Sequence, residues 1–193
     1  PTSYFVDAAE REKKGGQAFY SCLEYDSEIY FGSDNGRVWC YQKENGQFQL
    51  QNLPASSRIV SINSVEGNEL IFTTAKDGFF SYQPKTKAIE HFPASRFPNA
   101  SIHSVYVDKA SEVWFEQHIP GTVVHFNPRT RILKHEKVPV EPTSTDRSRP
   151  AFHIHEDING VLWVHPYGGG FSYFDRKSNS LHPFYNSLSG SDW

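Results

Sequence analysis

HEDINGVLWVHPYGGGFSYFDRKSNSLHPF, residues 155–184, is the stretch of sequence from which the fold can be predicted. It contains two apolar and aromatic segments, one around Trp163 and one ending at Phe174, with Gly170 between them. A polar turn then leads to Leu181. Neither segment has the i, i+3, i+4 apolar stripe of a helix, and Val, Trp, Tyr and Phe favour strands. The stretch therefore predicts short β-strands joined by tight turns.

The same pattern occurs three more times upstream. Its turn glycines recur at intervals of 42, 43 and 49 residues, and the last interval is longer because of an insertion at residues 137–150. Each glycine is expected to have a positive φ, because the chain turns back there. In every copy an aromatic residue ends the second segment and an apolar residue follows seven positions later: Tyr41 and Phe48, Tyr82 and Ile89, Phe126 and Leu133, Phe174 and Leu181.

A further alternating segment precedes each copy, so one period holds four short strands. Four strands in a period of roughly 40 to 50 residues are typical of a β-propeller blade. We therefore predict an all-β propeller with four recognisable four-stranded blades, as a single domain over residues 1–193. The predicted repeats cover residues 19–53, 59–92, 102–136 and 152–184. A blade cannot bury both of its faces alone, and stacking on the next blade explains the aromatic content of 15%.

Composition excludes several classes of protein. The formal net charge of −3 provides no basic surface for nucleic acid, and no apolar run reaches the length that crosses a membrane. Cys22 and Cys40 are too few for a disulfide scaffold, and we expect both to be buried or half-buried strand residues. The chain begins Pro-Thr-Ser and contains no Met, which leads us to expect an excised piece of a longer protein.

The fourth copy resembles a known repeat family. Its Ile154-His-Glu-Asp-Ile-Asn-Gly-Val-Leu-Trp163 segment, Gly170-Phe-Ser-Tyr-Phe-Asp175 and Leu181 are similar to the two-component regulator propeller repeat. The third copy is a fair match. The first two depart from the pattern, because Tyr30 and Ile71 replace the tryptophan and the second copy lacks the acidic pair.

That resemblance implies a function as well as a fold. The family forms the periplasmic sensor part of hybrid two-component histidine kinases of Bacteroides-type bacteria, anchored in the inner membrane, and its known ligands are mostly oligosaccharides. It implies a periplasmic, non-enzymatic sensing segment, with kinase output from other domains. Because propellers of the family usually have more than four blades, we expect either a fragment of a larger propeller or a part-ring that closes by self-association.

Several motifs in residues 153–170 resemble reactive sites but favour a structural interpretation. The triple glycine at 168–170 precedes a strand, not the helix that a phosphate-binding loop needs. His153 and His155 lie on one face of a strand and could bind zinc or copper with His165 or Glu156, but they alternate with apolar residues as in an ordinary half-buried strand. We predict no metal and no cofactor. Glu156 and Asp157 point to opposite faces, so they cannot flank one glycosidic bond, and Asp157 is expected to bond its own turn.

The loops between second and third strands, and the loops entering each first strand, open on the same end of a propeller. Polar groups beside an aromatic ring suit the hydroxyl groups and ring faces of sugars, so we place the candidate site there, with nearby Asp34, Asn35 and Asp77 on the same loops. The insertion at 137–150 is either a binding loop or a disordered one. The candidate ligand-binding residues are Arg58, Lys76, Arg96, His118, Arg147, Arg149, His165 and Tyr167.

Two other functions remain open. A propeller enzyme of the streptogramin-lyase kind has a similar repeat, but it needs a metal and a His-Glu set facing the axis, and the histidines here do not recur at one depth. A purely structural part-propeller needs no ligand. The preferred hypothesis is a sensing module that binds an oligosaccharide at the loop end or between protomers, with no nucleic acid partner and no membrane contact by this segment.

Overall fold

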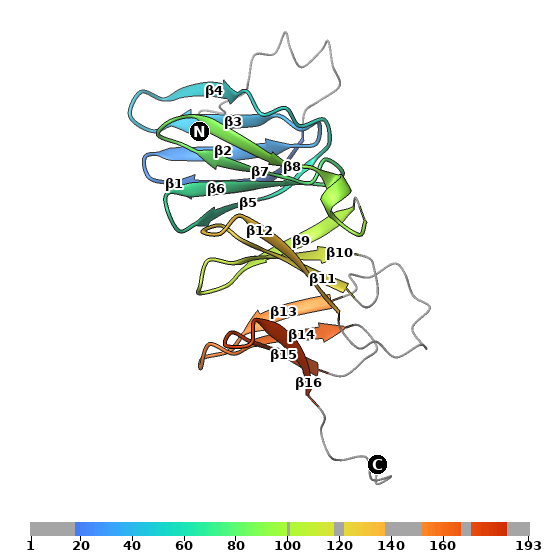
Figure 1. Cartoon of the computed structure of the whole chain (residues 1–193). Helices are drawn as coiled ribbons and strands as arrows, with labels where there is room; N and C mark the ends of the chain where they lie inside the picture. Colours follow the sequence, from blue (N-terminus) through green and yellow to red (C-terminus); the bar gives the residue numbers. More distant parts are fainter. Residues whose placement is uncertain (1–17, 100, 118–121, 138–151, 167–170, 185–193) are drawn as a thin grey trace, which may run out of the picture. The chain divides into compact units, whose positions relative to one another are not determined.

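The computed structural model describes residues 18–99, 101–117, 122–137, 152–166 and 171–184. Within these ranges the chain forms four antiparallel four-stranded sheets and one short 3-10 helix, η1 (Ala94–Arg96) (Figure 1). The prediction of an all-β fold with four four-stranded blades is confirmed. The chain divides into two compact units, Pro1–Ala94 and Ser95–Trp193, and each unit contains two blades.

Each blade is a meander in which strands consecutive in sequence are hydrogen-bonded neighbours. In the first unit, blade 1 consists of β1 (Phe19–Tyr25), β2 (Glu28–Ser33), β3 (Val38–Gln42) and β4 (Gln47–Gln51), and blade 2 of β5 (Ile59–Val65), β6 (Glu69–Thr74), β7 (Phe79–Gln83) and β8 (Ala88–Phe92).

The second unit repeats this arrangement. Blade 3 consists of β9 (Ile102–Val107), β10 (Val113–Gln117), β11 (Thr122–Asn127) and β12 (Ile132–Lys137), and blade 4 of β13 (Phe152–Glu156), β14 (Leu162–Pro166), β15 (Phe171–Asp175) and β16 (Ser180–Phe184). In the described part of the chain, no helix is long and apolar enough to span a membrane.

The seven-residue spacing of the repeat has a geometric cause. The aromatic residue and the apolar residue that follows it are cross-strand partners of the hairpin between the third and fourth strands, as in Tyr41 with Phe48 and Phe174 with Leu181. The hairpin closes because one turn residue takes a positive φ. That residue lies five positions after the aromatic in all four blades: Gly46, Lys87, Arg131 and Asn179.

The two blades of each unit pack face to face. We call the face that carries Tyr30 in blade 1, Trp114 in blade 3 and Trp163 in blade 4 the forward face, and the opposite face the backward face. In the first unit the forward face of blade 1 packs on the backward face of blade 2. The buried cluster contains Tyr30, Val38, Cys40, Ile59, Ile62, Leu70, Phe72, Phe80 and Tyr82.

In the second unit the forward face of blade 3 packs on the backward face of blade 4. Trp114 is fully buried and its ring contacts that of Phe174 edge-on, with centroids 4.9 Å apart. Ile154, Leu162 and Val164 complete the contact from blade 4. Burial of one such aromatic side chain contributes about 2–3 kcal/mol. Trp114 thus shows the stacking of aromatic residues between blades that the repeat predicts.

Two turn glycines have the expected positive φ. Gly36 has φ +82° and Gly78 has φ +85°, and both approach the backbone of the following loop closely. A Cβ at Gly78 would lie 2.1 Å from the carbonyl oxygen of Phe92. Each glycine therefore allows a hairpin to contact the loop that leaves or enters its blade. Gly121 and Gly170 lie outside the described residues.

The cysteines behave differently from each other. Both lie in strands, as expected, but Cys40 is buried whereas Cys22 is exposed. The prediction of a buried or half-buried residue is therefore wrong for Cys22, because the strand that carries it lies at the edge of its sheet. Burial, followed by the charge of Glu28, raises the pKa of Cys40 to about 11.

Gly78 and Gly67 provide a matched test of the hairpin contact. Gly67 has φ +88°, but a Cβ at this position would meet no atom within 4 Å, so Gly67→Ala carries the conformational cost alone, about 1 kcal/mol. Gly78→Ala adds the clash with backbone, and we expect it to cost about 3 kcal/mol or more. Chemical denaturation of the two variants measures the difference. Equal losses would show that the close approach at Gly78 is not a constraint.

Candidate functional site

The structure describes half of the predicted site residues. Arg58 and Lys76 lie in the first unit, and Arg96 and His165 lie in the second. The other candidates, His118, Arg147, Arg149 and Tyr167, lie outside the described residues, as does most of the insertion at 137–150.

Arg58 and Lys76 are brought together at the loop end of blade 2. The N–H of Ala75 donates to the carbonyl of Arg58 at 2.9 Å. One residue further, the N–H of Lys76 donates to the Ser57 hydroxyl at 3.0 Å. Both basic residues are exposed. The loop entering β5 and the β6–β7 hairpin therefore present two positive charges on one small surface.

Asp77 fixes this pair of loops. Its carboxylate accepts hydrogen bonds from the N–H groups of Ser56 and Ser57, both at 2.8 Å, and from both serine hydroxyls at 2.8 and 2.9 Å. The Asp77 carbonyl also contacts Nε2 of His91 at 2.8 Å. Burial opposes ionisation of Asp77, but the serine hydrogen bonds outweigh burial and lower its pKa. The Asp77 carboxylate therefore positions the loop that enters β5.

Tyr20 is the residue that sequence analysis missed. It lies at the start of β1, where the pairing with β2 shifts between Phe19 and Ser21, so Tyr20 occupies a β-bulge. Bulges turn a side chain away from the regular alternation. Tyr20 is 57% exposed, and the guanidinium carbon of Arg58 lies 5.1 Å from the centroid of its ring, which is cation–π geometry.

We call Tyr20, Arg58 and Lys76 the loop-end surface. It offers guanidinium and ammonium donors, a phenol group and an exposed aromatic ring. Asp34 lies on the β2–β3 hairpin at the same end of blade 1, where its N–H donates to the carbonyl of Ala18 at 3.0 Å. Donors, an acceptor and a ring therefore occur together, a combination that suits a polyhydroxylated ligand.

Arg96 and His165 occupy other surroundings in the second unit. Arg96 ends η1, and its carbonyl contacts Nε2 of His135 at 2.9 Å. The His165 ring stacks on the ring of Phe171, with centroids 4.6 Å apart and an interplanar angle of 22°. These two residues lie on different segments and make different kinds of contact, so neither is counted in the loop-end surface.

Glu156 and Asp157 both have structural partners. Asp157 accepts hydrogen bonds from the N–H groups of Asn159 and Val161 and from the indole N–H of Trp163 at 3.0 Å. The indole bond is the main reason that its pKa is lowered. Glu156 instead accepts the N–H of Lys109, in the turn of blade 3, at 2.6 Å. The expectation that Asp157 bonds its own turn is confirmed.

In blade 3 an aspartate of the equivalent turn also accepts a hydrogen bond from the indole of the repeat tryptophan. Asp108 accepts the N–H groups of Ala110 and Glu112, and it accepts the indole N–H of Trp114 at 2.9 Å. Arg176 of blade 4 then contacts Asp108 at 3.1 Å and Glu156 at 3.4 Å. The acidic residues of these turns therefore hold the tryptophans and connect the two blades of the unit.

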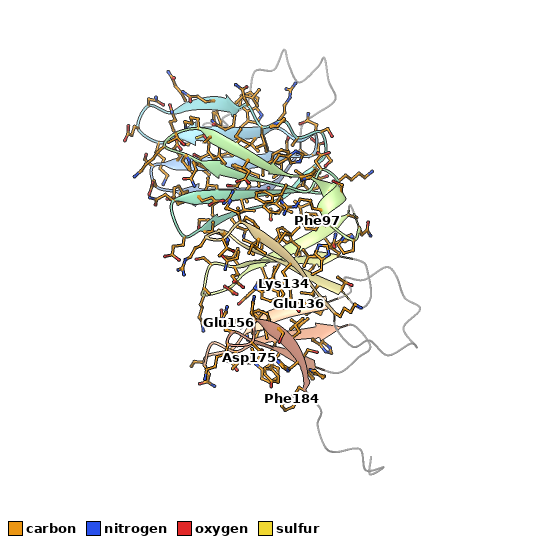
Figure 2. All side chains as sticks on the ribbon, viewed as in Figure 1. Phe97, Lys134, Glu136, Glu156, Asp175 and Phe184 are labelled. Atoms are coloured by element: carbon orange, nitrogen blue, oxygen red, sulfur yellow. The ribbon has the colours of Figure 1, made fainter. Side chains whose placement is uncertain are left out.

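A buried imidazole lies between two carboxylates of blade 3, on the face that packs against blade 4. His125 is 3% exposed and stacks on Trp114 with centroids 4.3 Å apart. Its Nδ1 lies 3.3 Å from a Glu112 oxygen, and its Nε2 lies 3.4 Å from a Glu136 oxygen. Figure 2 labels Glu136 beside Lys134 on β12, and the two form an ion pair at 2.5 Å.

This cluster lacks the access that catalysis requires. Burial raises the pKa of Glu112, but the neighbouring His125 imidazole and the hydrogen bond from the Asn127 amide outweigh that effect, so the pKa is lowered. The imidazole is enclosed by the rings of Trp114 in blade 3 and Phe174 in blade 4, so it is not accessible to a substrate. Among the described residues, no group of three or more His, Cys, Asp or Glu side chains is placed to hold a metal ion.

The sheet arrangement is similar to that of several solved structures. The extracellular domain of a putative one-component system from B. thetaiotaomicron matches with a TM-score of 0.62 and 16% identity, over 86% of this chain and 22% of that chain. The extracellular domain of a putative hybrid two-component system from the same organism matches with 0.60 and 15%, over 86% and 23%.

Virginiamycin B lyase from Staphylococcus aureus matches with a TM-score of 0.65 and 11% identity, over 90% of this chain and 57% of the lyase. The chain therefore spans less than two thirds of each of these proteins. Identities this low show the fold alone, which is that of a β-propeller built from four-stranded blades. No protein-family model and no curated protein matches the sequence.

The Asp77 hydrogen bonds provide a test of the site's rigidity. Asp77→Asn removes the charge from the serine contacts, and we expect a loss of about 1 kcal/mol of unfolding free energy at neutral pH. Because the folded pKa is lowered, this contribution is present above roughly pH 4 and disappears as the pH falls through the folded pKa. Denaturation at several pH values should therefore bring the wild type toward the variant in acid.

Asp34→Asn, on the hairpin of blade 1, is the matched control, and its effect should stay within about 0.5 kcal/mol at every pH. If Asp77→Asn behaves like this control, the carboxylate does not hold the loops.

Proposed function

We propose that this chain is the ligand-binding part of an extracytoplasmic sensor and that it has no catalytic activity of its own. The observation that carries the proposal is the loop-end surface, where an exposed tyrosine ring lies under the guanidinium of Arg58 and the exposed Lys76 lies on the hairpin bonded to the Arg58 loop. Asp77 holds the supporting loops by four hydrogen bonds, so the surface is ordered before a ligand arrives. A preorganised surface loses less entropy on binding.

The chemistry of this surface favours an oligosaccharide. Sugar rings present C–H faces that pack on aromatic rings, and their hydroxyls both donate and accept hydrogen bonds. Tyr20 provides the aromatic contact, and Arg58 and Lys76 provide donors. The basic pair also favours sugars that carry a carboxylate or sulfate, because guanidinium groups bind such anions in a bidentate manner.

The fold supports the wider setting. Propeller blades of this kind occur in the extracellular domains of putative one-component and hybrid two-component systems, and also in an auxiliary nutrient binding protein from Bacteroides ovatus with a TM-score of 0.56. We propose the periplasm as the location, in a protein whose output domains lie elsewhere. The exposed Cys22 thiol provides a test of the location. A membrane-impermeant maleimide labels Cys22 in intact cells if the chain is periplasmic. If the proposed location is wrong, labelling occurs only after the cells are lysed.

Binding is tested by calorimetry of the chain against a panel of neutral and acidic oligosaccharides. We expect at least one member to bind, and we expect Tyr20→Ala and Arg58→Ala each to weaken that binding about tenfold or more, equivalent to about 1.4 kcal/mol. Lys85→Ala is the matched control, because it removes an exposed lysine at the β7–β8 turn, on the other end of blade 2.

The proposal is wrong if no panel member binds the folded chain. It is also wrong if the two site variants bind as tightly as the Lys85→Ala control. Thermal unfolding of each variant separates loss of the surface from loss of the fold.

A further inference from the structure

The forward face of blade 4 carries a grid of aromatic and imidazole rings. Strand pairing places the outward side chains of the four strands in two rows across the sheet. Neighbouring rings are in contact, as in Trp163 with Phe184 at 5.4 Å and Tyr173 with His182 at 5.6 Å. The first row is His155, Trp163, Tyr173 and His182, and the second is His153, His165, Phe171 and Phe184.

The same row has a defined role in the interface within each unit. In blade 1 the equivalent row contains Tyr30, whose ring lies 6.0 Å from Phe72 of blade 2. In blade 3 it contains Trp114, which contacts Phe174 of blade 4. Both residues are fully buried. At this position of the repeat, an aromatic side chain therefore packs against the backward face of another blade.

In blade 4 this face remains accessible. Phe171 is 52% exposed and Phe184 is 49% exposed, while Trp163 and Tyr173 are half-buried. Figure 2 labels Phe184 at the end of β16. The eight residues of the grid include no acidic side chain. Two carboxylates lie beside it: Asp175 accepts hydrogen bonds from the Lys177 N–H and the Ser178 hydroxyl in its own turn, and Asp157 accepts one from the indole N–H of Trp163. A face of this composition has the character of a blade interface and not of a solvated sheet.

The backward face of blade 1 has the complementary character. Strand pairing gives two rows on this face: Cys22, Phe31, Trp39 and Leu50, and Glu24, Ile29, Tyr41 and Phe48. Leu50 is 45% exposed, the two β1 residues Cys22 and Glu24 are exposed at the edge, and Glu24 is paired with Lys43; the five remaining side chains are half-buried. In blade 2 the equivalent backward positions, among them Phe72 and Phe80, are the ones that receive the forward face of blade 1.

We propose that the forward face of blade 4 binds the backward face of blade 1 in a second copy of this chain. One chain carries both kinds of face, and each unit already joins a forward face to a backward face through the same rows of the repeat. The contact between copies continues this interface with the same chemistry. It is heterologous, because two different surfaces meet, so repeated contacts give closed rings or longer assemblies. It is independent of the ligand-binding function proposed above.

The test uses two variants that each remove one face. Tyr173→Glu places a charge in the forward grid of blade 4, and Phe48→Glu places one in the backward face of blade 1. Analytical ultracentrifugation measures the mass of each protein. We expect the wild type to exceed the monomer mass in a concentration-dependent manner and each variant alone to remain a monomer.

The decisive sample is an equimolar mixture of the two variants. The intact backward face of Tyr173→Glu pairs with the intact forward face of Phe48→Glu, so the mixture forms a one-to-one heterodimer that cannot grow further. An unfolded variant cannot give this result. A wild type that stays monomeric overturns the proposal, and so does a mixture that stays monomeric. If Phe48→Glu alone self-associates, forward faces pair with each other and the proposed contact is wrong. Oligosaccharide titration of the monomeric variants keeps the outcome separate from that of the proposed function.

Discussion

The structure depends on one kind of contact, the packing of a ring on the forward face of a blade against the backward face of the next blade. Tyr30 makes it in the first unit and Trp114 makes it in the second. A four-stranded sheet with an aromatic face is not stable alone in water, and a pair of sheets buries both inner faces. Hydrogen bonds in the turns support this contact. The Asp108 carboxylate accepts a hydrogen bond from the indole N–H of Trp114, and Arg176 of the next blade forms an ion pair with the same carboxylate.

The residues that pack the blades together lie in the strands, so the residues of the loop ends can vary and carry the function. The strands, the seven-residue hairpin spacing and the turn glycines are shared between blades, and they define the fold. The surface made by Tyr20, Arg58 and Lys76 lies where the copies differ in sequence, outside the buried core. A ligand at such a position can contact two blades at once, since Tyr20 belongs to blade 1 and Arg58 leads into blade 2.

Much of the fold was predictable from the sequence because its determinants are local. Strand order and hairpin register follow from alternation and from the spacing of Tyr41 to Phe48 and its equivalents. Turn positions also predict that Arg58 and Lys76 lie at one end of a blade, which is where the structure places them. The contact of Tyr20 with Arg58 was not predicted. It depends on a β-bulge that turns Tyr20 toward Arg58, and the alternation of the sequence does not reveal a bulge. The cluster of His125 with Glu112 and Glu136 was not predicted, because it joins two strands and the connection before β10. The contact of Glu156 with Lys109 was not predicted, because the two residues are 47 positions apart in the sequence.

Face-to-face packing is best tested by a double-mutant cycle across the two sheets of the second unit. Unfolding free energies of Trp114→Leu, Phe174→Leu and the double variant give the coupling between the rings. Stacked sheets predict a coupling of about 1 kcal/mol. The pair Trp114→Leu and Phe184→Leu, with Phe184 on the opposite face of blade 4, should be additive within about 0.3 kcal/mol. Additivity of Trp114 with Phe174 would contradict the conclusion that forward and backward faces hold the blades together.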